Sequence, residues 1–231
     1  MDGDDASVRL NKFIATTTGK SRREADNIIE QGRVTINGAP VELGRRVSQG
    51  DSVEIDRQKI ERKTSYTYIL LNKPTGYVCS RRKQGETPTV YSLLPQDLQD
   101  LKLVGRLDKD SSGAILLTDD GDFAFQMTHP KFYKVKYYKV RLNKDLEPLH
   151  QQMIGDFGVD LPDGKSKLGL ERLSDDNRKG WTVVMSEGRN RQIRRTFMSL
   201  GYTVVKLHRT SFGPYSLGDI KSGSYQTVDM R

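Results

Sequence analysis

Short apolar runs that end at glycines or charged turns are distributed along most of the chain. After residue 65 the runs predict strands at 68–72, 114–118, 134–142 and 181–185. Helical spacing is restricted to residues 145–154 and 191–200. Because strands follow one another without regular strand–helix alternation, a parallel α/β sheet is excluded. The sequence predicts an α+β domain with a mainly antiparallel, mixed sheet and flanking helices.

The first 55 residues have a different pattern, in which two short helices precede short strands. Ser7 is a candidate N-cap for the first helix, which Gly19 ends. The second helix begins with a capping box formed by Ser21 and Glu24, and it ends at Gly32. Alternating residues at 34–36 and 53–55 predict the strands. We therefore expect a small module over residues 1–62 and a larger domain over 63–231.

Charge and composition narrow the class of protein. The 231 residues include 38 Lys and Arg against 30 Asp and Glu, which leaves 38 − 30 = +8 and indicates a polyanionic partner. No apolar run approaches the ~20 residues that cross a bilayer, and the acidic start is unlike a secretory signal, so we expect a cytoplasmic protein. Cys79 is the single cysteine, which excludes an intramolecular disulfide, and three scattered histidines argue against a metal site.

A polar loop at residues 105–113 lies between two apolar runs and is the first candidate for chemistry. It contains Asp108 and Asp110. From the residues alone, these carboxylates fit a nucleophile, a general base, a pair of metal ligands or ordinary turn residues, and turn residues are the commonest case.

The small module resembles the S4 RNA-binding domain. The resemblance runs from residue 8 to about residue 55 and includes Arg9-Leu10 with Phe13, the helix start at 21–25 and the segment 32–38. It implies that the two helices face RNA. The side chains then expected to contact phosphate are those of Arg9, Lys12, Arg22, Arg23 and Arg33.

Three further motifs, in order along the chain, resemble those of the RsuA-type pseudouridine synthases. They are Leu71-Asn72-Lys73-Pro74-Thr75-Gly76, then Gly105-Arg106-Leu107-Asp108 continuing to residue 118, then residues 186–195. The resemblance implies an enzyme that isomerises uridine in RNA without a cofactor, with Asp108 as the essential aspartate. A carboxylate can attack the sugar as a nucleophile or remove a proton from it, and the sequence does not choose between these roles.

The same resemblance assigns partners to Asp108. Arg194 matches the basic residue that pairs with this aspartate, and helical spacing separates Arg191, Arg194 and Arg195 from the apolar stripe of residues 193, 197 and 200. Tyr138 matches a tyrosine that stacks on the target base, although Tyr133 and Tyr137 are close to it. The RNA path in this domain is expected to include Lys73, Arg106, Arg189, Arg191 and Arg195.

The expected partner is ribosomal RNA, free or in a pre-ribosomal particle, bound by a monomer. The sequence of residues 187–191 slightly favours a resemblance to the enzymes that modify RNA of the large subunit. Two other functions fit parts of the sequence. A non-catalytic S4-domain RNA chaperone or ribosome-associated protein would explain the charge but not the 105–108 loop. A hydrolase would use Asp108 and Asp110 as paired carboxylates or as Mg²⁺ ligands.

Overall fold

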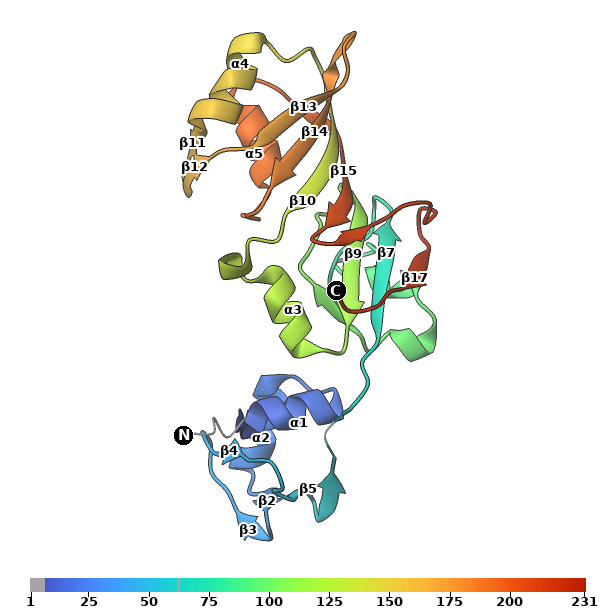
Figure 1. Ribbon diagram of the computed structural model, residues 1–231. Helices are drawn as coiled ribbons and strands as arrows, with labels where there is room; N and C mark the ends of the chain where they lie inside the picture. The colour runs from blue at the N-terminus through green and yellow to red at the C-terminus, as the bar shows by residue number, and fades with distance from the viewer. Residues whose placement is uncertain (1–6, 62) are drawn as a thin grey trace. The chain divides into compact units, whose positions relative to one another are not determined.

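The computed structural model describes residues 7–61 and 63–231 (Figure 1). The chain divides into two compact units, of which the first extends to Thr67 and includes Asp119–Gly121, and the second holds Tyr68–Thr118 and Asp122–Arg231. The acidic residues 2–5 and the expected boundary at residue 62 lie outside the described residues. Among those that are described, no helix has the length and apolar character needed to cross a bilayer.

The first unit packs two helices against short antiparallel strands. Its elements are α1 (Leu10–Thr18), α2 (Arg22–Glu30), β1 (Val8–Arg9), β2 (Val34–Ile36), β3 (Ala39–Pro40), β4 (Arg46–Val47), β5 (Val53–Ile55) and β6 (Gln58–Ile60). Strands β3, β2, β5 and β6 form one sheet in that order, and β1 pairs with β4. Leu10 and Ile14 of α1 pack in one core with Ala25 and Ile29 of α2 and with Val34.

Local signals define the helix ends in this unit. Ser21 and Glu24 form the predicted capping box on α2, and Gly19 ends α1 with a left-handed φ of 76°. Ser7 does not cap α1, because the helix begins later and Arg9 precedes it without a side-chain cap. Instead the Ser7 hydroxyl accepts a hydrogen bond from Nε of Arg46, 2.8 Å away, beside the β1–β4 pair.

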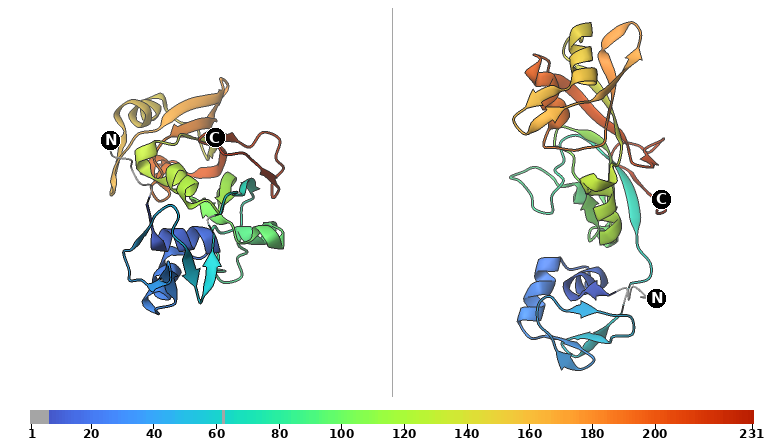
Figure 2. Two further views of the ribbon diagram at one scale, coloured as in Figure 1. Left: turned by 60° about the horizontal axis from the view of Figure 1, so that its bottom comes forward. Right: turned by 60° about the vertical axis from the view of Figure 1, so that its left-hand side comes forward.

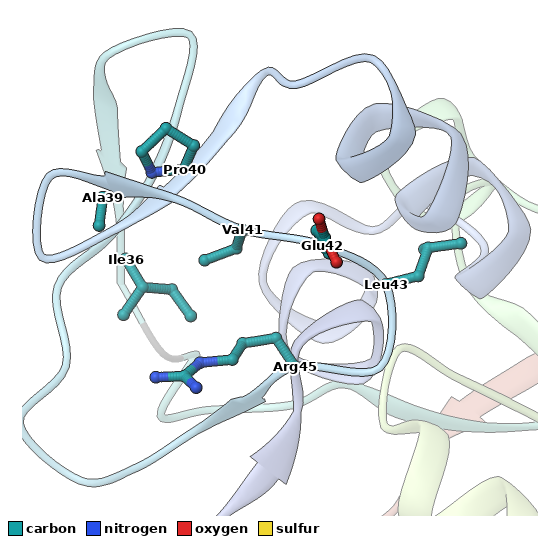
Figure 3. Close-up of a pocket in the computed structure, with 7 residues that line it drawn as sticks. All are labelled: Ile36, Ala39, Pro40, Val41, Glu42, Leu43 and Arg45. Atoms are coloured by element: carbon teal, nitrogen blue, oxygen red, sulfur yellow. The ribbon is translucent and has the colours of Figure 1, made fainter.

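The first unit has a hollow of about 480 Å³ next to β2 (Figure 3). It is lined by Ile36, Ala39, Pro40, Val41, Glu42, Leu43 and Arg45. Figure 3 shows Ile36 and Val41 pointing toward the hollow and Arg45 extending toward Ile36. None of these residues carries the predicted chemistry, so the hollow is not the candidate active site.

The second unit is built on a large twisted sheet. The strands of the second unit are β7 (Tyr68–Lys73), β8 (Lys102–Val104), β9 (Ser112–Thr118), β10 (Lys136–Leu142), β11 (Val159–Leu161), β12 (Gly164–Ser166), β13 (Gly169–Ser174), β14 (Asn177–Met185), β15 (Val204–Phe212), β16 (Tyr215–Ser216) and β17 (Tyr225–Thr227). Strands β11 and β12 form a separate two-stranded hairpin, and the others belong to the large sheet. The helical segments are η1 (Val90–Leu93), η2 (Gln96–Leu98), α3 (Gly121–Thr128), η3 (Pro130–Phe132), α4 (Pro148–Gln152), η4 (Met153–Phe157) and α5 (Gln192–Ser199).

The sheet has the order β13-β14-β10-β15-β9-β7-β17, with β16 on β15 and β8 on β9. Strands β9 and β15 are parallel, whereas the other pairs among the described strands of this sheet are antiparallel. The predicted α+β class with a mainly antiparallel, mixed sheet is confirmed. Residues 77–80, which resemble a strand in sequence, contribute an isolated bridge at Val78 rather than a ladder.

Helices and loops cover both sides of this sheet. One core contains Leu71, Ile115 and Trp181 and extends to Ile193 and Phe197 of α5. A second core lies on the opposite side of β7 and β9, where α3 packs against the sheet. Helices α4 and α5 and the hairpin β11–β12 gather at one end of the unit, at the top of Figure 1 and of the right-hand view in Figure 2.

Strand register places the sequence motifs in one row across the sheet. Lys73 of β7 is opposite Gly113 of β9, Gly113 is opposite Arg209 of β15, and Arg209 is opposite Tyr138 of β10. The Asp108 loop leads directly into β9, so it lies at the end of this row. Segments that are more than a hundred residues apart in sequence therefore meet beside Asp108.

Candidate active site

Asp108 lies in a tight turn between β8 and β9. The amide of Ser111 donates a hydrogen bond of 3.1 Å to the carbonyl oxygen of Asp108, and the amide of Leu107 donates to Sγ of Cys79 at 3.4 Å. The Asp108 side chain is 31% exposed. A carboxylate held by its backbone but still accessible can act on a ligand that enters the site.

Arg191 contacts the carboxylate of Asp108. Its Nη1 lies 3.3 Å from Oδ2 of Asp108 and 3.2 Å from Oδ1 of Asp110, so one guanidinium joins both carboxylates. Arg191 precedes α5 with a left-handed φ of 46°, which is a costly conformation for a residue with a side chain. The contacts of Arg191 with the two carboxylates stabilise this strained conformation, and the strained residue is the one that faces the candidate aspartate.

The predicted pair between Arg194 and Asp108 is not formed in the part of the chain that the structure describes. Arg194 donates to the carbonyl oxygens of Asp110 and Val204, at 3.0 and 2.8 Å, and its Nη2 lies 3.5 Å from Oδ2 of Asp110. The pairing of Arg194 with Asp108 therefore stays a prediction. Arg191 lies outside α5. The helix therefore does not present Arg191 and Arg194 on one face.

Asp110 anchors both arginines. Burial by itself raises the pKa of Asp110, but the hydrogen bond from Arg191 and the charges of Arg194 and Arg191 bring that pKa below its usual value. In return, the hydrogen bond to Asp110 raises the pKa of Arg191. Asp110 is thus a stable anion that positions Arg191 against Asp108.

Lys73 fixes the backbone of the loop that carries Asp108. The side chain has 0% exposure, and burial lowers its pKa. Its Nζ donates to the carbonyl oxygens of Pro74, Asp108, Lys109 and Ser111, at 3.0, 3.1, 3.5 and 2.7 Å. The predicted RNA contact at Lys73 is wrong, because a buried ammonium that already serves four carbonyls cannot reach a phosphate.

Replacing Lys73 by methionine is expected to lower the free energy of unfolding by about 2–4 kcal/mol, because it leaves buried carbonyl oxygens without a donor. Urea unfolding measures this loss. The control is Lys109→Met in the same loop, where an exposed ammonium donates to the Thr87 hydroxyl and the expected change is within about 0.5 kcal/mol. Equal effects of the two substitutions would contradict the role of Lys73 in fixing the loop backbone.

Tyr138 lies in the core of the second unit, 7% exposed, in the same cluster as Leu107 and Leu71. Its neighbour Tyr137 is 42% exposed, as strand alternation predicts. Tyr138 reaches the row beside the Asp108 loop through the strand pairing described above. Among the described residues, no hydrogen bond joins Tyr138 to Asp108, and its stacking on a base stays a prediction.

Arg189 and Arg195 are engaged within the protein. Both bind Asp163, which lies in the turn of the β11–β12 hairpin: Arg195 contacts the carboxylate oxygens at 2.9 and 2.6 Å, and Nη1 of Arg189 contacts Oδ1 at 3.2 Å. Arg189 also donates to the carbonyl oxygens of Gly164 and Lys165. These two arginines attach the hairpin to the start of α5, and their expected place along the RNA path stays a prediction.

Lys136 holds the loop that carries Arg191. Its Nζ donates to the carbonyl oxygens of Ser186 and Glu187, at 3.3 and 3.1 Å, and lies 5.3 Å from the centroid of the Phe212 ring. Burial, together with the nearby charge of Arg209, lowers the pKa of Lys136 to about 8. The sequence offered no signal for this role, because an isolated lysine at the start of a strand is ordinarily solvated.

The pKa of Lys136 predicts a pH dependence of stability. Its folded value of about 8 is below the unfolded value of 10.5, so in this window the unfolded chain binds a proton that the folded chain does not. The free energy of unfolding of the wild type, relative to Lys136→Met, should therefore increase as the pH rises from 8 to 10.5. Urea unfolding of both proteins at pH 7.5 and 9.5 tests this, and parallel pH profiles would contradict it.

The remaining predicted RNA contacts lie at the surface. Arg106 is exposed beside Asp108, and no hydrogen bond or ion pair given for the described residues involves it. In the first unit, Arg9 and Arg23 are exposed, Lys12 is partly buried, Arg22 donates to Asn11 at 3.3 Å, and Arg33 forms an ion pair with Asp56. These contacts leave their RNA-binding roles as predictions.

Comparisons with known proteins agree with the two units. The family model for RNA pseudouridylate synthase matches residues 67–199, and the model for the S4 domain matches residues 8–53. The ribosomal small subunit pseudouridine synthase A of Pasteurella multocida is 37% identical over 96% of both chains. The ribosomal large subunit pseudouridine synthase B of Bacillus subtilis is 34% identical over 93% of this chain and 89% of its own.

A solved structure extends the similarity to the fold. The crystal structure of a pseudouridylate synthase superposes with a TM-score of 0.68 at 34% identity and covers 96% of both chains. The matches include the S4 module and the domain that carries Asp108, and they span nearly the whole sequence. The chain therefore belongs to the RNA pseudouridine synthases, as an enzyme of the RsuA type with an N-terminal S4 domain.

Proposed function

We propose that this enzyme converts specific uridines of ribosomal RNA into pseudouridine and that Asp108 is its essential carboxylate. The observation that carries the proposal is the geometry of the Asp108 loop. Lys73 fixes the loop backbone, Arg191 contacts the carboxylate at 3.3 Å, and the side chain stays 31% exposed. Such a carboxylate is positioned by the protein and open to a substrate.

The reaction needs no external reactant. The bond between C1′ of the ribose and N1 of the uracil breaks, the freed uracil turns in the pocket, and a bond forms between C1′ and C5. The proton on C5 is then lost and N1 gains one, so the atoms of substrate and product balance. The target base has to leave its helix or loop first, because neither bond is accessible in a stacked nucleotide.

Ribosomal RNA is supported as the substrate by the two relatives, which are named as pseudouridine synthases of the small and the large ribosomal subunit. The two identities, 37% and 34%, are close, so the proposal covers RNA of either subunit. The excess of positive charge, +8, supplies attraction to phosphate that is independent of sequence.

Mapping pseudouridine in ribosomal RNA tests the proposal. Carbodiimide treatment followed by reverse transcription is applied to RNA from a strain that lacks the gene and from the same strain carrying the wild-type gene or Asp108→Asn. We expect at least one stop to disappear without the gene, to return with the wild type and to stay absent with the variant. Identical maps in all strains would refute ribosomal RNA as the substrate.

A further inference from the structure

A group of exposed aromatic side chains lies between α3 and β10, and we call it the 125–133 surface. It consists of Phe125, His129, Lys131, Phe132 and Tyr133. Phe125, Phe132 and Tyr133 are 47%, 37% and 74% exposed. The ring centroid of Phe125 lies 4.7 Å from that of His129 and 5.8 Å from that of Phe132. Exposed aromatic groups of this kind mark binding surfaces more often than they serve folding.

Positive charge accompanies these rings. The ammonium of Lys131 lies 4.7 Å from the centroid of Phe132 and 5.4 Å from that of Phe125. Because Lys131 is exposed, its side chain is free to turn from the rings to a ligand. The remaining face of α3 is used for folding, since Phe123 and Met127 are buried in the core.

The positive character continues along β10. Tyr137, Lys139 and Arg141 are exposed and alternate with buried residues, so they share one face of the strand. Lys206 of β15 is exposed and lies opposite Arg141. Glu171, two strands away from Lys139, limits this cationic strip to β10 and β15.

The 125–133 surface is connected to both sides of the candidate active site. A Cβ on Gly105, which begins the loop of Asp108, would lie 3.7 Å from Cγ2 of Thr128, which lies between Phe125 and His129 in sequence. On the other side, β10 begins at Lys136, three residues after Tyr133, and Lys136 donates to the carbonyl oxygens of the loop that carries Arg191. An RNA strand that leaves the site can therefore reach this surface within a few nucleotides.

We propose that the 125–133 surface binds unpaired nucleotides of the RNA substrate, with bases stacked on the rings of Phe125, Phe132 and Tyr133. Lys131 and the strip of Lys139, Arg141 and Lys206 bind the phosphates. The chemistry favours single-stranded RNA, since only unstacked bases present their faces to aromatic rings, whereas a duplex presents phosphates and 2′-hydroxyls. This inference rests on the proposed function, because it assumes an RNA substrate opened near its target.

Binding by the full-length chain tests the proposal. The probes are a mixed-sequence single-stranded RNA of about 12 nucleotides and the same sequence as a duplex, titrated by fluorescence anisotropy. Phe125→Ala/Phe132→Ala is expected to weaken single-strand binding about tenfold, which is ~1.4 kcal/mol, and to leave duplex binding unchanged. The control is Phe157→Ala, which removes a ring of 65% exposure elsewhere in the same unit and should change neither affinity.

A second set of measurements distinguishes a loss of RNA binding from a loss of folding in the double variant. RNA with 4-thiouridine, irradiated on the wild type, should form crosslinks that mass spectrometry locates at residues 125–133, and circular dichroism should show unchanged melting of the double variant. Unchanged single-strand affinity, or an equal loss for duplex or for the control, would overturn the proposal. These assays do not depend on turnover, so identical pseudouridine maps in all strains would refute the proposed function without affecting them.

Discussion

Replacing Asp108 by asparagine is expected to abolish pseudouridine formation, with a loss of turnover of at least about a thousandfold. The amide has nearly the shape of the carboxylate, but it cannot attack the sugar or take a proton from it. Because Lys73 binds the carbonyl oxygen of residue 108 and not its side chain, the loop should keep its position. Tritium release from RNA labelled at C5 measures the turnover.

The controls separate chemistry from binding and folding. RNA affinity of Asp108→Asn should stay within a few fold of the wild type, because the residues proposed to contact phosphate lie elsewhere. Asp110→Asn is the matched variant, and it should lower turnover less, by about tenfold, since it loosens Arg191 without removing the reacting group. Full activity of Asp108→Asn would exclude Asp108 from the reaction.

Gly113→Ala is expected to have the largest effect on stability, a loss of more than about 4 kcal/mol. A Cβ at this position would lie 2.1 Å from the carbonyl oxygen of Arg209, and the backbone φ of +110° is unfavourable for any residue with a side chain. Relief would require β9 and β15 to separate at the point where they pair. Thermal unfolding of the purified protein, or its absence from the soluble fraction, reports this result.

Gly121→Ala is the control for this substitution. Gly121 begins α3, and a Cβ built there has no atom within 4 Å. Alanine is a better helix former than glycine, so this variant should be as stable as the wild type or slightly more stable. If the two alanine variants melted at the same temperature, the close approach of β9 and β15 would not limit the fold.

Local patterns in the sequence predict much of this fold. The capping box at Ser21 and the left-handed glycine at position 19 depend on adjacent residues, and both occur as predicted. The alternation of residues likewise places Tyr137 and Tyr138 on opposite faces of their strand, and the burial pattern of the strand agrees. Ser7 is a residue type that often caps helices, but it does not cap α1, because Arg46 from a distant segment donates a hydrogen bond to its hydroxyl.

The parts of the site that could not be predicted depend on distant backbone. Lys73 becomes buried because carbonyl oxygens from another loop converge on its ammonium, and no local pattern encodes such an arrangement. The contact between Arg191 and Asp108 was not predicted, because the helix was expected to include residue 191, which instead precedes the start of α5. A left-handed residue at that boundary turns Arg191 toward the carboxylates and leaves Arg194 to bind carbonyl oxygens.

The position of β15 has a consequence for synthesis of the protein. This strand begins at Val204, yet it lies between β10 and β9 and completes the row next to the Asp108 loop. During translation, two earlier strands have to remain unjoined until a ribosome has made residues 204–212. Long-range pairing of this kind is slow to form and leaves strand edges open meanwhile. A nascent enzyme can therefore complete its S4 module well before it has a catalytic centre.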